Sequence, residues 1–520
     1  MSAFARNLQL SKHAARGRRG VVAAQNSKAA AVGAEVLAAG GHAVDAAVAT
    51  SLALAATEPW MSGLGGGSTM LVLDAARGTV DSIDAGMVAP MALDPGAYPL
   101  AGGTAGDLFA WPAVVDDRNV LGPSSFAVPG HLAGLGLAHE RHGRMAFGEL
   151  VQPARRLAAE GLEIDWYAAL MIATAARDLR HFPASAAVYL SDGLPPVPAL
   201  ADVPSRLPLG RLAETLALVA EEGPETLYTG GLAELVARDL EALESPLGRG
   251  DLAAYRASAA PALRAAHGAA QVFAMPGLFA GETLRRCLAA LADEMGGGDS
   301  PDATAYLAYA RVLKAAYARR LREDGHASDG PSPSCTSHLS VIDADGNMVA
   351  LTQTLLSLFG SRVVLPSSGI LMNNGIMWFD PRPGGPNSMA PGVRPLSNMC
   401  PVIAMDAAHR LALGASGGRR ILPAVLQILS FVLDHHMSLE EAFAQPRIDV
   451  SGEDLVTMSA DLDEGVRAAL AEAHGARTVR AEVYPLRFAC PVAVLHDLVQ
   501  GDRYGTAEVI HPWADAVAVA

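Results

Sequence analysis

The chain contains few cysteines, and their arrangement excludes two common cysteine-dependent architectures. Only four occur among 520 residues, at Cys287, Cys335, Cys400 and Cys490. No two of them form a CxxC pair, and their spacing fits neither a zinc site nor a disulfide framework. We therefore expect no metal site, and reduced cysteines that occupy small apolar positions in a cytoplasmic protein.

The chain also lacks an apolar run long enough to cross a membrane. Its longest apolar stretches, residues 46–56 and 421–433, contain Thr, Ser, Gln or Pro. Both fall short of the roughly 18 to 20 residues that a membrane span needs. The basic pair Arg18-Arg19 is followed by polar residues 25–28 rather than by the apolar core of a secretory signal. We expect buried helices, no membrane contact and a cytoplasmic location.

An excess of positive charge is likewise missing. The net charge is −15, and hydrophobic residues make up 51% of the chain against 18% charged residues. This balance predicts a globular protein without the clustered Lys and Arg that nucleic acids require. The glycine-rich turn at residues 62–67 lacks the Gly-Lys-Ser/Thr of a phosphate loop, which argues against nucleotide binding. An anionic substrate would need a local basic pocket.

Hydrophobic periodicity predicts several helices and a central hairpin. Residues 69–73 are predicted as a strand, and Asp345-Gly346 as the turn of a hairpin whose second strand covers residues 348–355. The helices follow from apolar residues at helical spacing or from almost wholly apolar runs. They are predicted at residues 32–37, 45–56, 150–158, 212–219 and 421–433.

The polar segment at residues 321–335, LREDGHASDGPSPSC, is typical of an exposed linker. It ends abruptly at the first hairpin strand, as a proteolytic processing site would. Composition alone favours an ordinary linker between domains.

Thr336 follows this linker directly. A threonine hydroxyl is a weak nucleophile unless a base takes its proton, and a free α-amino group titrates near about 7.7 to 8.0. Cleavage of the Cys335–Thr336 bond would therefore give Thr336 its own base near neutral pH. The route would be attack of the Thr336 hydroxyl on the Cys335 carbonyl, an N-to-O acyl shift and hydrolysis of the ester.

The hairpin places a second threonine near Thr336. If Asp345-Gly346 is the centre of the turn, Thr336 faces Leu355 and Thr354 faces Ser337. The two threonines are then one residue out of register, and a one-residue β-bulge would bring their hydroxyls together.

Acyl transfer also needs donors for the developing oxyanion. The run GASGGRR at residues 414–420 precedes the predicted helix at residues 421–433, so its backbone N–H groups would lie at a helix N-terminus. Glycine pairs before helices are also common without any function.

Taken together, these residues resemble the γ-glutamyltranspeptidase family of N-terminal-nucleophile (Ntn) hydrolases. The similar motifs run in the same order through nearly the whole chain. They are GGHAVDAAVATSLALAATEPWMSGLGGGSTM at residues 40–70, VPGHLAGL at 128–135, VQPARRLAAEG at 151–161, TSHLSVIDADGN from Thr336, FGS at 359–361, SGILMNN at 368–374, RPLSNMCP at 394–401 and GASGGRRI at 414–421.

The resemblance implies an α+β fold, a four-layer αββα sandwich, built jointly by a large subunit of residues 1–335 and a small subunit of residues 336–520. It implies no metal and no organic cofactor. Matching positions receive roles: Thr336 as the nucleophile, Thr354 as the hydroxyl that orients it, Gly417 and Gly418 as the oxyanion hole, and Ser397 as one of two serines that hold the substrate carboxylate, with Asn398 replacing the other.

Four positions depart from the γ-glutamyl pattern. Gly86 stands where an arginine holds the α-carboxylate of a γ-glutamyl group, and Leu356, Gly375 and Trp378 stand where three polar residues hold its α-amino group. Each charged group left unpaired costs roughly 1 to 3 kcal/mol or more. We therefore expect a pocket that is not built for a γ-glutamyl group.

Arg362, Arg382 and Arg419 lie within the matching motifs where the γ-glutamyl pattern does not require arginine. An arginine fork suits a carboxylate, although each of these arginines would equally suit a structural ion pair. The run TQTLLSLFGSRVVLPSSGILMNNGIMWFDPRPG resembles the oxamate amidohydrolase branch, which converts oxamate into oxalate and ammonia in purine catabolism. We therefore predict an autoprocessing amidohydrolase for a small anionic amide, most specifically oxamate.

Two other functions remain open at this stage. One is a γ-glutamyl hydrolase or transpeptidase (a glutathione hydrolase), or a related acylase for a larger acyl group. The other is an unprocessed, non-catalytic relative that acts as a binding protein. We expect the two processed subunits to associate, and a dimer of such αβ pairs is left open.

Overall fold

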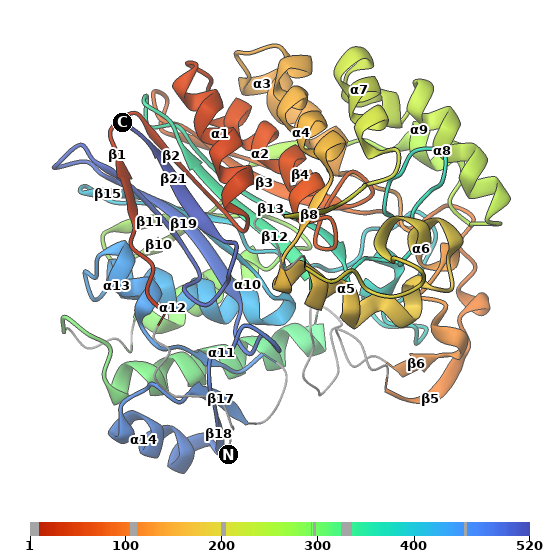
Figure 1. The fold of residues 1–520 in the computed structure, drawn as a ribbon. Coiled ribbons are helices and arrows are strands. Elements are labelled where there is room, and N and C mark those ends of the chain that lie inside the picture. Colours follow the sequence, from red (N-terminus) through yellow and green to blue (C-terminus); the bar gives the residue numbers. More distant parts are fainter. Residues whose placement is uncertain are drawn as a thin grey trace.

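The protein is a stack of two β-sheets enclosed by helices (Figure 1). The computed structural model describes residues 10–104, 112–198, 204–292, 294, 298–323, 335–451 and 455–520. At its centre two seven-stranded antiparallel sheets lie face to face, and helices cover the outer face of each. This is the predicted four-layer αββα sandwich, so the expected α+β fold class is confirmed.

Both sheets are built from strands that lie on either side of the Cys335–Thr336 bond. Sheet I has the order β1 (Ala15–Gly17), β20 (Arg503–Ala507), β19 (Cys490–Asp497), β15 (His409–Ser416), β14 (Val402–Met405), β11 (Ala270–Ala274) and β10 (Leu263–His267). Sheet II has the order β21 (Asp515–Val519), β2 (Gly20–Ala24), β12 (Cys335–Ile342), β13 (Met348–Leu356), β3 (Gly67–Asp74), β4 (Thr79–Ala85) and β9 (Ser258–Pro261). Each sheet therefore needs strands from both sides of this bond, and the division into two subunits at residues 335 and 336 stays a prediction.

Side chains point alternately to the two faces of each strand, so the buried side chains form three layers. On β2, Val22 and Ala24 pack against the helices, whereas Val21 and Ala23 face sheet I. The third layer lies between sheet I and the helices that cover it. Strands buried on both faces explain the dense runs of Val, Ala and Leu in the sequence.

Helices of the N-terminal half belong to the layer on the side of sheet II, and later helices belong to the layer on the side of sheet I (Figure 1). The first group is α1 (Ser27–Ala38), α2 (Ala43–Thr57), α3 (His131–His142), α4 (Phe147–Glu160), α5 (Trp166–Leu179), α6 (Pro183–Tyr189), α7 (Leu212–Glu222), α8 (Gly231–Ala242) and α9 (Arg249–Ala254). The second group is α10 (Gly281–Ala292), α11 (Ala303–Glu323), α12 (Ile421–Leu433), α13 (Leu439–Ala444) and α14 (Glu464–His474).

The five helices predicted from periodicity are confirmed as α1, α2, α4, α7 and α12. Within the described ranges, no helix combines the length and apolarity that a membrane crossing requires. Cys287, Cys400 and Cys490 are buried, as expected.

Two predicted boundaries were wrong. The helix α11 continues to Glu323, so the polar segment does not begin at Leu321; residues 324–334 lie outside the described residues. The body of the hairpin is shifted by one residue, because Ser337 pairs with Gln353 rather than with Thr354. The carboxylate of Asp343 causes this shift, since it accepts hydrogen bonds from the N–H groups of Asp345 and Asn347 and so widens the turn.

Close packing of α1 on α2 depends on Gly33. A Cβ atom at this position would lie 2.1 Å from Thr50 Oγ1 and 3.2 Å from the carbonyl oxygen of Ala46. We expect Gly33→Ala to lower the free energy of unfolding by about 1 to 3 kcal/mol, because the two helices must move apart. Thermal unfolding measures this. Gly250→Ala, at a helical glycine with open space around it, is the matched control and should not lower the melting temperature.

Candidate active site

Thr336 lies near the start of β12, on the side of sheet II that faces sheet I. Its neighbours Ser337 and Leu339 face the helices, while His338 faces sheet I, where a Cβ on Gly414 would touch its ring. Only 5% of the Thr336 surface is exposed. The hydroxyl is therefore held between the two sheets and shielded from bulk water.

The register of the hairpin places Thr336 opposite Thr354. Ser337 pairs with Gln353, so the residue before it faces Thr354; the pairing then shifts before Cys335, which pairs with Leu356, so that Leu355 is the extra residue of a bulge on β13. Thr336 Oγ1 donates a hydrogen bond of 3.4 Å to Thr354 Oγ1. The two predicted threonines are therefore in contact, but through the one-residue change of register rather than through the bulge that the sequence suggested.

The residues after Thr354 adopt unusual backbone conformations that hold its hydroxyl. Leu356 has a φ of +84°, and its N–H group donates to Thr354 Oγ1 over 2.8 Å. Phe359 and Arg362 also have positive φ values, of 60° and 66°. Three such non-glycine residues within seven positions are rare, and local strain of this kind concentrates at functional sites.

The predicted glycine turn lies between β15 and α12. Gly417 has a φ of +134° and Gly418 a φ of +58°, and a Cβ on Gly417 would meet Ala489 Cα at 2.9 Å. Only glycine fits both requirements at position 417. The N–H groups here precede the helix α12, where backbone donors have no partner within the helix. Their role as the oxyanion hole stays a prediction.

Two side chains on the sheet II side contact the end of β15 that leads into this glycine turn. Gln25, at the end of β2, donates to Ser416 Oγ and, over 3.3 Å, to the carbonyl of Cys490. His338 packs on Gly414, and its pKa falls to about 3 because it is fully buried. The end of β15 therefore lies at the same end of the sandwich as Thr336.

A buried chain of polar side chains runs behind the nucleophile, and sequence reasoning did not find it. Ser62 donates to Ser337 over 3.3 Å, and Ser337 donates to Glu58 Oε2 over 2.9 Å. We call this set the buried polar chain; its members are His131, Ser51, Gln353, Ser62, Ser337 and Glu58. Complete burial raises the pKa of Glu58 to about 8. The signal in the sequence was a glutamate directly after a nearly all-apolar helix.

Ser397 and Asn398 lie on a loop fixed by a buried arginine of the large segment. Arg320 donates to the Ser397 carbonyl over 2.7 Å and to Thr283 Oγ1 over 3.1 Å. Asn398 is 6% exposed, and its Nδ2 finds no acceptor among the described residues. This loop therefore combines a nearby positive charge with a free donor.

The three arginines singled out in the sequence have different surroundings. Arg362 lies 3.6 Å from Asp178, and Arg382 forms a forked pair with Asp380, whose shortest contact is 2.7 Å. Arg419 is buried beside the glycine turn, and its carbonyl accepts from the Tyr317 hydroxyl. Ion pairs thus occupy Arg362 and Arg382, and substrate binding by any of the three stays a prediction.

At Gly86, another arginine fills the space that a side chain would occupy. Arg394 Nη1 lies 3.3 Å from the position of a Cβ on Gly86, and it donates to Asp84 over 3.0 Å and to the Gly86 carbonyl over 2.6 Å. Leu356 and Trp378 are buried in the apolar cluster between the sheets. At Gly375, a Cβ would come within 2.7 Å of Met87 and Ala127.

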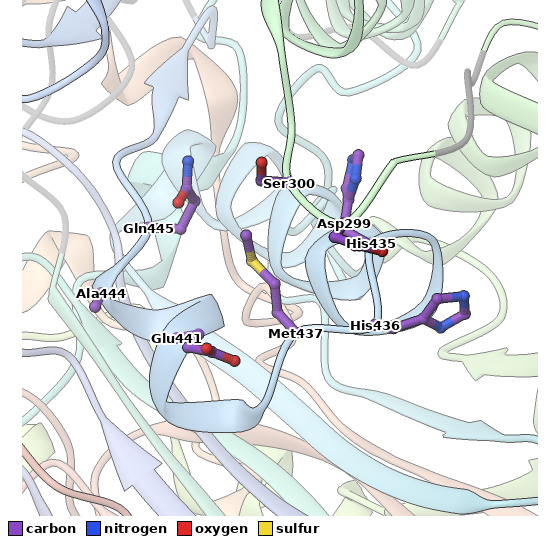
Figure 2. A pocket seen from close by; sticks show the side chains of 8 residues that line it. All are labelled: Asp299, Ser300, His435, His436, Met437, Glu441, Ala444 and Gln445. Carbon is purple, nitrogen blue, oxygen red and sulfur yellow. The ribbon is translucent and has the colours of Figure 1, made fainter.

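A separate surface pocket lies at the far end of α12 (Figure 2). Asp299 lies beside His435 in it, and Met437 separates them from Glu441. The 13 residues of α12 span about 20 Å. This pocket is therefore remote from the glycine turn and from Thr336. Among the described residues, no cluster of three or more His, Cys, Asp or Glu is arranged to hold a metal ion.

Comparison with known proteins agrees with this geometry. The profile of the family described as Gamma-glutamyltranspeptidase matches residues 29–329 and 321–501. The Acylase ACY 1 proenzyme of Pseudomonas sp. (strain SE83) is 34% identical over 504 residues, covering 90% of this chain and 88% of that protein. The glutathione hydrolase proenzyme of Escherichia coli (strain K12) is 30% identical, with coverage of 84% and 81%. The structure of a cephalosporin acylase from Bacillus halodurans superposes with a TM-score of 0.85 at 21% identity, covering 100% of this chain and 99% of that one.

The layered fold and the threonine pair first define the class, an Ntn-type hydrolase that acts on amide bonds. Within that class, the chain belongs to the γ-glutamyltranspeptidase family. The expectation of an enzyme is confirmed, which argues against the alternative of a non-catalytic binding protein.

The first test of the site concerns self-cleavage. We expect the wild-type protein to give two bands on a denaturing gel, of residues 1–335 and 336–520, and Thr336→Ala to give one uncut band without hydrolytic activity. N-terminal sequencing of the smaller band should begin at Thr336. A single band from an active preparation would refute the assignment.

A second test concerns Thr354. Loss of one hydrogen bond to the nucleophile costs about 1 kcal/mol, so Thr354→Ala should lower kcat roughly five- to tenfold and leave KM nearly unchanged. Thr354→Ser keeps the hydroxyl and serves as the control, with activity close to that of the wild type. Equal activity of the two variants would remove Thr354 from the site.

Proposed function

We propose that this protein is an autoprocessing amidohydrolase that cleaves a small anionic amide through an acyl-enzyme on Thr336, with oxamate as the leading substrate. The observation that carries the proposal is the hydrogen bond between Thr336 of β12 and Thr354, which faces it on β13. Cleavage before Thr336 would free its α-amino group, and the large and small subunits would stay associated because both sheets need strands from each.

In the proposed reaction, the α-amino group takes the proton of the Thr336 hydroxyl, which attacks the amide carbonyl. Backbone N–H groups of Gly417 and Gly418 stabilise the oxyanion. Ammonia leaves with the proton returned by the amine, and water then hydrolyses the ester. For oxamate the products are oxalate and ammonia, which is the basis for a cytoplasmic role in purine catabolism.

The surroundings of Gly86 support a substrate other than a γ-glutamyl group. Arg394 is committed to Asp84 and to the Gly86 carbonyl, and it occupies the space where a side chain at position 86 would begin. Leu356 and Trp378 contribute apolar surface, so an ammonium group would have to lose its water without gaining a charged partner.

The Ser397–Asn398 loop supports a carboxylate in the substrate. Arg320 lies directly behind it, and Asn398 Nδ2 is a buried donor without an acceptor among the described residues. A carboxylate placed against this donor would satisfy it and would be stabilised by the buried guanidinium. A short substrate such as oxamate carries its carboxylate next to the scissile carbonyl.

A related acylase is the second candidate function. The apolar cluster between the sheets contains Met87, Met389 and Met399 beside Leu356 and Trp378. Methionine side chains adapt easily to ligands of different shape, so this cluster would also accommodate a longer acyl chain. The similarity to Acylase ACY 1 over nearly the whole chain favours the same alternative.

A substrate screen separates these functions. Ammonia release is measured from oxamate, succinamate and glutamine, and p-nitroaniline release from γ-glutamyl- and glutaryl-p-nitroanilide, with Thr336→Ala as the blank. We expect kcat/KM for oxamate to exceed that for the γ-glutamyl compound about 100-fold or more, since two charged groups of the latter stay unpaired. Comparable values would refute the substrate assignment, and preference for the glutaryl compound would establish the acylase.

A further inference from the structure

Glu58 is a buried carboxyl group that contacts Ser337, the residue next to the nucleophile. It caps the C-terminal end of α2, where its N–H group donates to the Leu54 carbonyl over 2.8 Å. None of its surface is exposed. Its Oε2 accepts a hydrogen bond of 2.9 Å from Ser337, the residue directly after Thr336. Burying an ionised carboxylate in this apolar layer would cost free energy, which favours the neutral acid.

The buried polar chain has a single direction, and it ends on Glu58. Ser51 donates to Gln353 Oε1, Gln353 Nε2 donates to Ser62 over 2.8 Å, and Ser62 donates to Ser337. Each member therefore uses its hydrogen to satisfy the next one. The last acceptor is Glu58 Oε2, so this carboxyl fixes the orientation of every hydroxyl before it, including that of Ser337.

The second oxygen of Glu58 faces a histidine from the C-terminal segment. His511 Nδ1 accepts from the N–H groups of Trp513 and Ala514, which places the ring hydrogen on Nε2. That nitrogen lies 3.8 Å from Glu58 Oε1 and 3.3 Å from the Tyr167 hydroxyl. Glu58 Oε1 accepts no hydrogen bond from the described residues.

We propose that Glu58 is a positioning residue for the reaction of Thr336: as a neutral acid, it anchors Ser337 on the helix side of β12 and thereby holds Thr336 in the register that places its hydroxyl against Thr354. This inference rests on the proposed nucleophilic role of Thr336. The anchor and the hydroxyl lie on opposite sides of the same strand, so movement of Ser337 must move Thr336 with it.

The charge state of Glu58 matters because nothing nearby would neutralise a carboxylate. His511 faces it from the C-terminal segment, and burial lowers the pKa of His511 to about 3, so this ring stays uncharged. Burial raises the pKa of Cys490 of β19, so its thiol is also uncharged, and Lys12 faces His511 rather than Glu58. After cleavage the α-amino group of Thr336 joins these surroundings. Burial raises the pKa of Glu58 to about 8, so its proton is lost only in mildly alkaline solution.

The pH profile of kcat tests the proposal, with whichever amide the substrate screen identifies. The wild type should rise as the Thr336 amine loses its proton and should then fall as Glu58 ionises, reaching about one tenth of its maximum near pH 9. Glu58→Gln keeps the acceptor for Ser337 but cannot ionise. It should stay within about threefold of the wild type at pH 7 and should lack the alkaline decline. Glu149→Gln makes the same change at an exposed carboxyl and should keep the wild-type profile.

Ser337→Ala is the second variant, because it breaks the link and leaves Glu58 in place. We expect it to lower kcat at pH 7 about tenfold with little change in KM, to slow self-cleavage and to flatten the alkaline decline. Ser337→Thr, which restores a hydroxyl, should recover most of the activity. An alkaline decline of wild-type size in either Glu58→Gln or Ser337→Ala overturns the proposal, and the serine variant decides alone if the glutamine variant does not fold.

Thermal unfolding provides a readout that does not depend on catalysis. A carboxyl whose pKa is raised on folding binds its proton in the folded state while the unfolded chain has lost it, so it destabilises the fold increasingly from about pH 4.5 to about pH 8. The melting temperature of Glu58→Gln minus that of the wild type should therefore increase across this interval, and a constant difference contradicts a neutral Glu58.

If wild type and Thr336→Ala are equally uncut and inactive, the proposed function fails; if only the Glu58 results fail, that function stands.

Discussion

The structure depends on the register in which β12 pairs with β13. Because Ser337 pairs with Gln353, Thr336 faces Thr354, and a slip of one residue would turn one of the two hydroxyls to the other side of the sheet. In the observed register Thr336 Oγ1 reaches Thr354 Oγ1. A bulge on β13 follows directly after this pair and interrupts the ladder of backbone hydrogen bonds. Contacts around the two threonines therefore have to hold the strand ends in place.

Those contacts come from both faces of sheet II. On the side of sheet I, the positive φ of Leu356 turns its N–H group back onto Thr354, and Gln25 joins the glycine turn to the end of β2. On the helix side, Ser337 is tied to Glu58 through the buried polar chain. Polar groups buried in this way specify one geometry, because any other arrangement leaves a donor or acceptor unsatisfied. The site is therefore rigid for reasons that lie outside the site itself.

The sequence predicted features that depend on neighbouring residues better than features that depend on residues far apart in the chain. The hairpin was visible because its turn and strands are adjacent in sequence, yet its register was one residue off, since the Asp343 side chain widens the turn. The helix α12 was predicted at its observed bounds because its apolar run is uninterrupted by charge. Glu58 was overlooked because Ser337, its partner, is 279 residues away. For Arg362, the sequence could not show that Asp178, far away in the chain, pairs with it.

The same geometry has to serve two reactions, self-cleavage and substrate hydrolysis, and the α-amino group of Thr336 is available as a base only in the second. In the intact chain the carbonyl under attack belongs to Cys335, and Thr336 has no free amine, so only its orientation can promote the acyl shift. After cleavage the carbonyl belongs to the substrate, and the amine becomes available as the base. The register of the hairpin, Thr354 and the anchor through Ser337 are present in both states, whereas the amine is present in one. A neutral Glu58 suits this sequence of events, because a carboxylate at that position would attract the proton of the new amine and keep the base protonated.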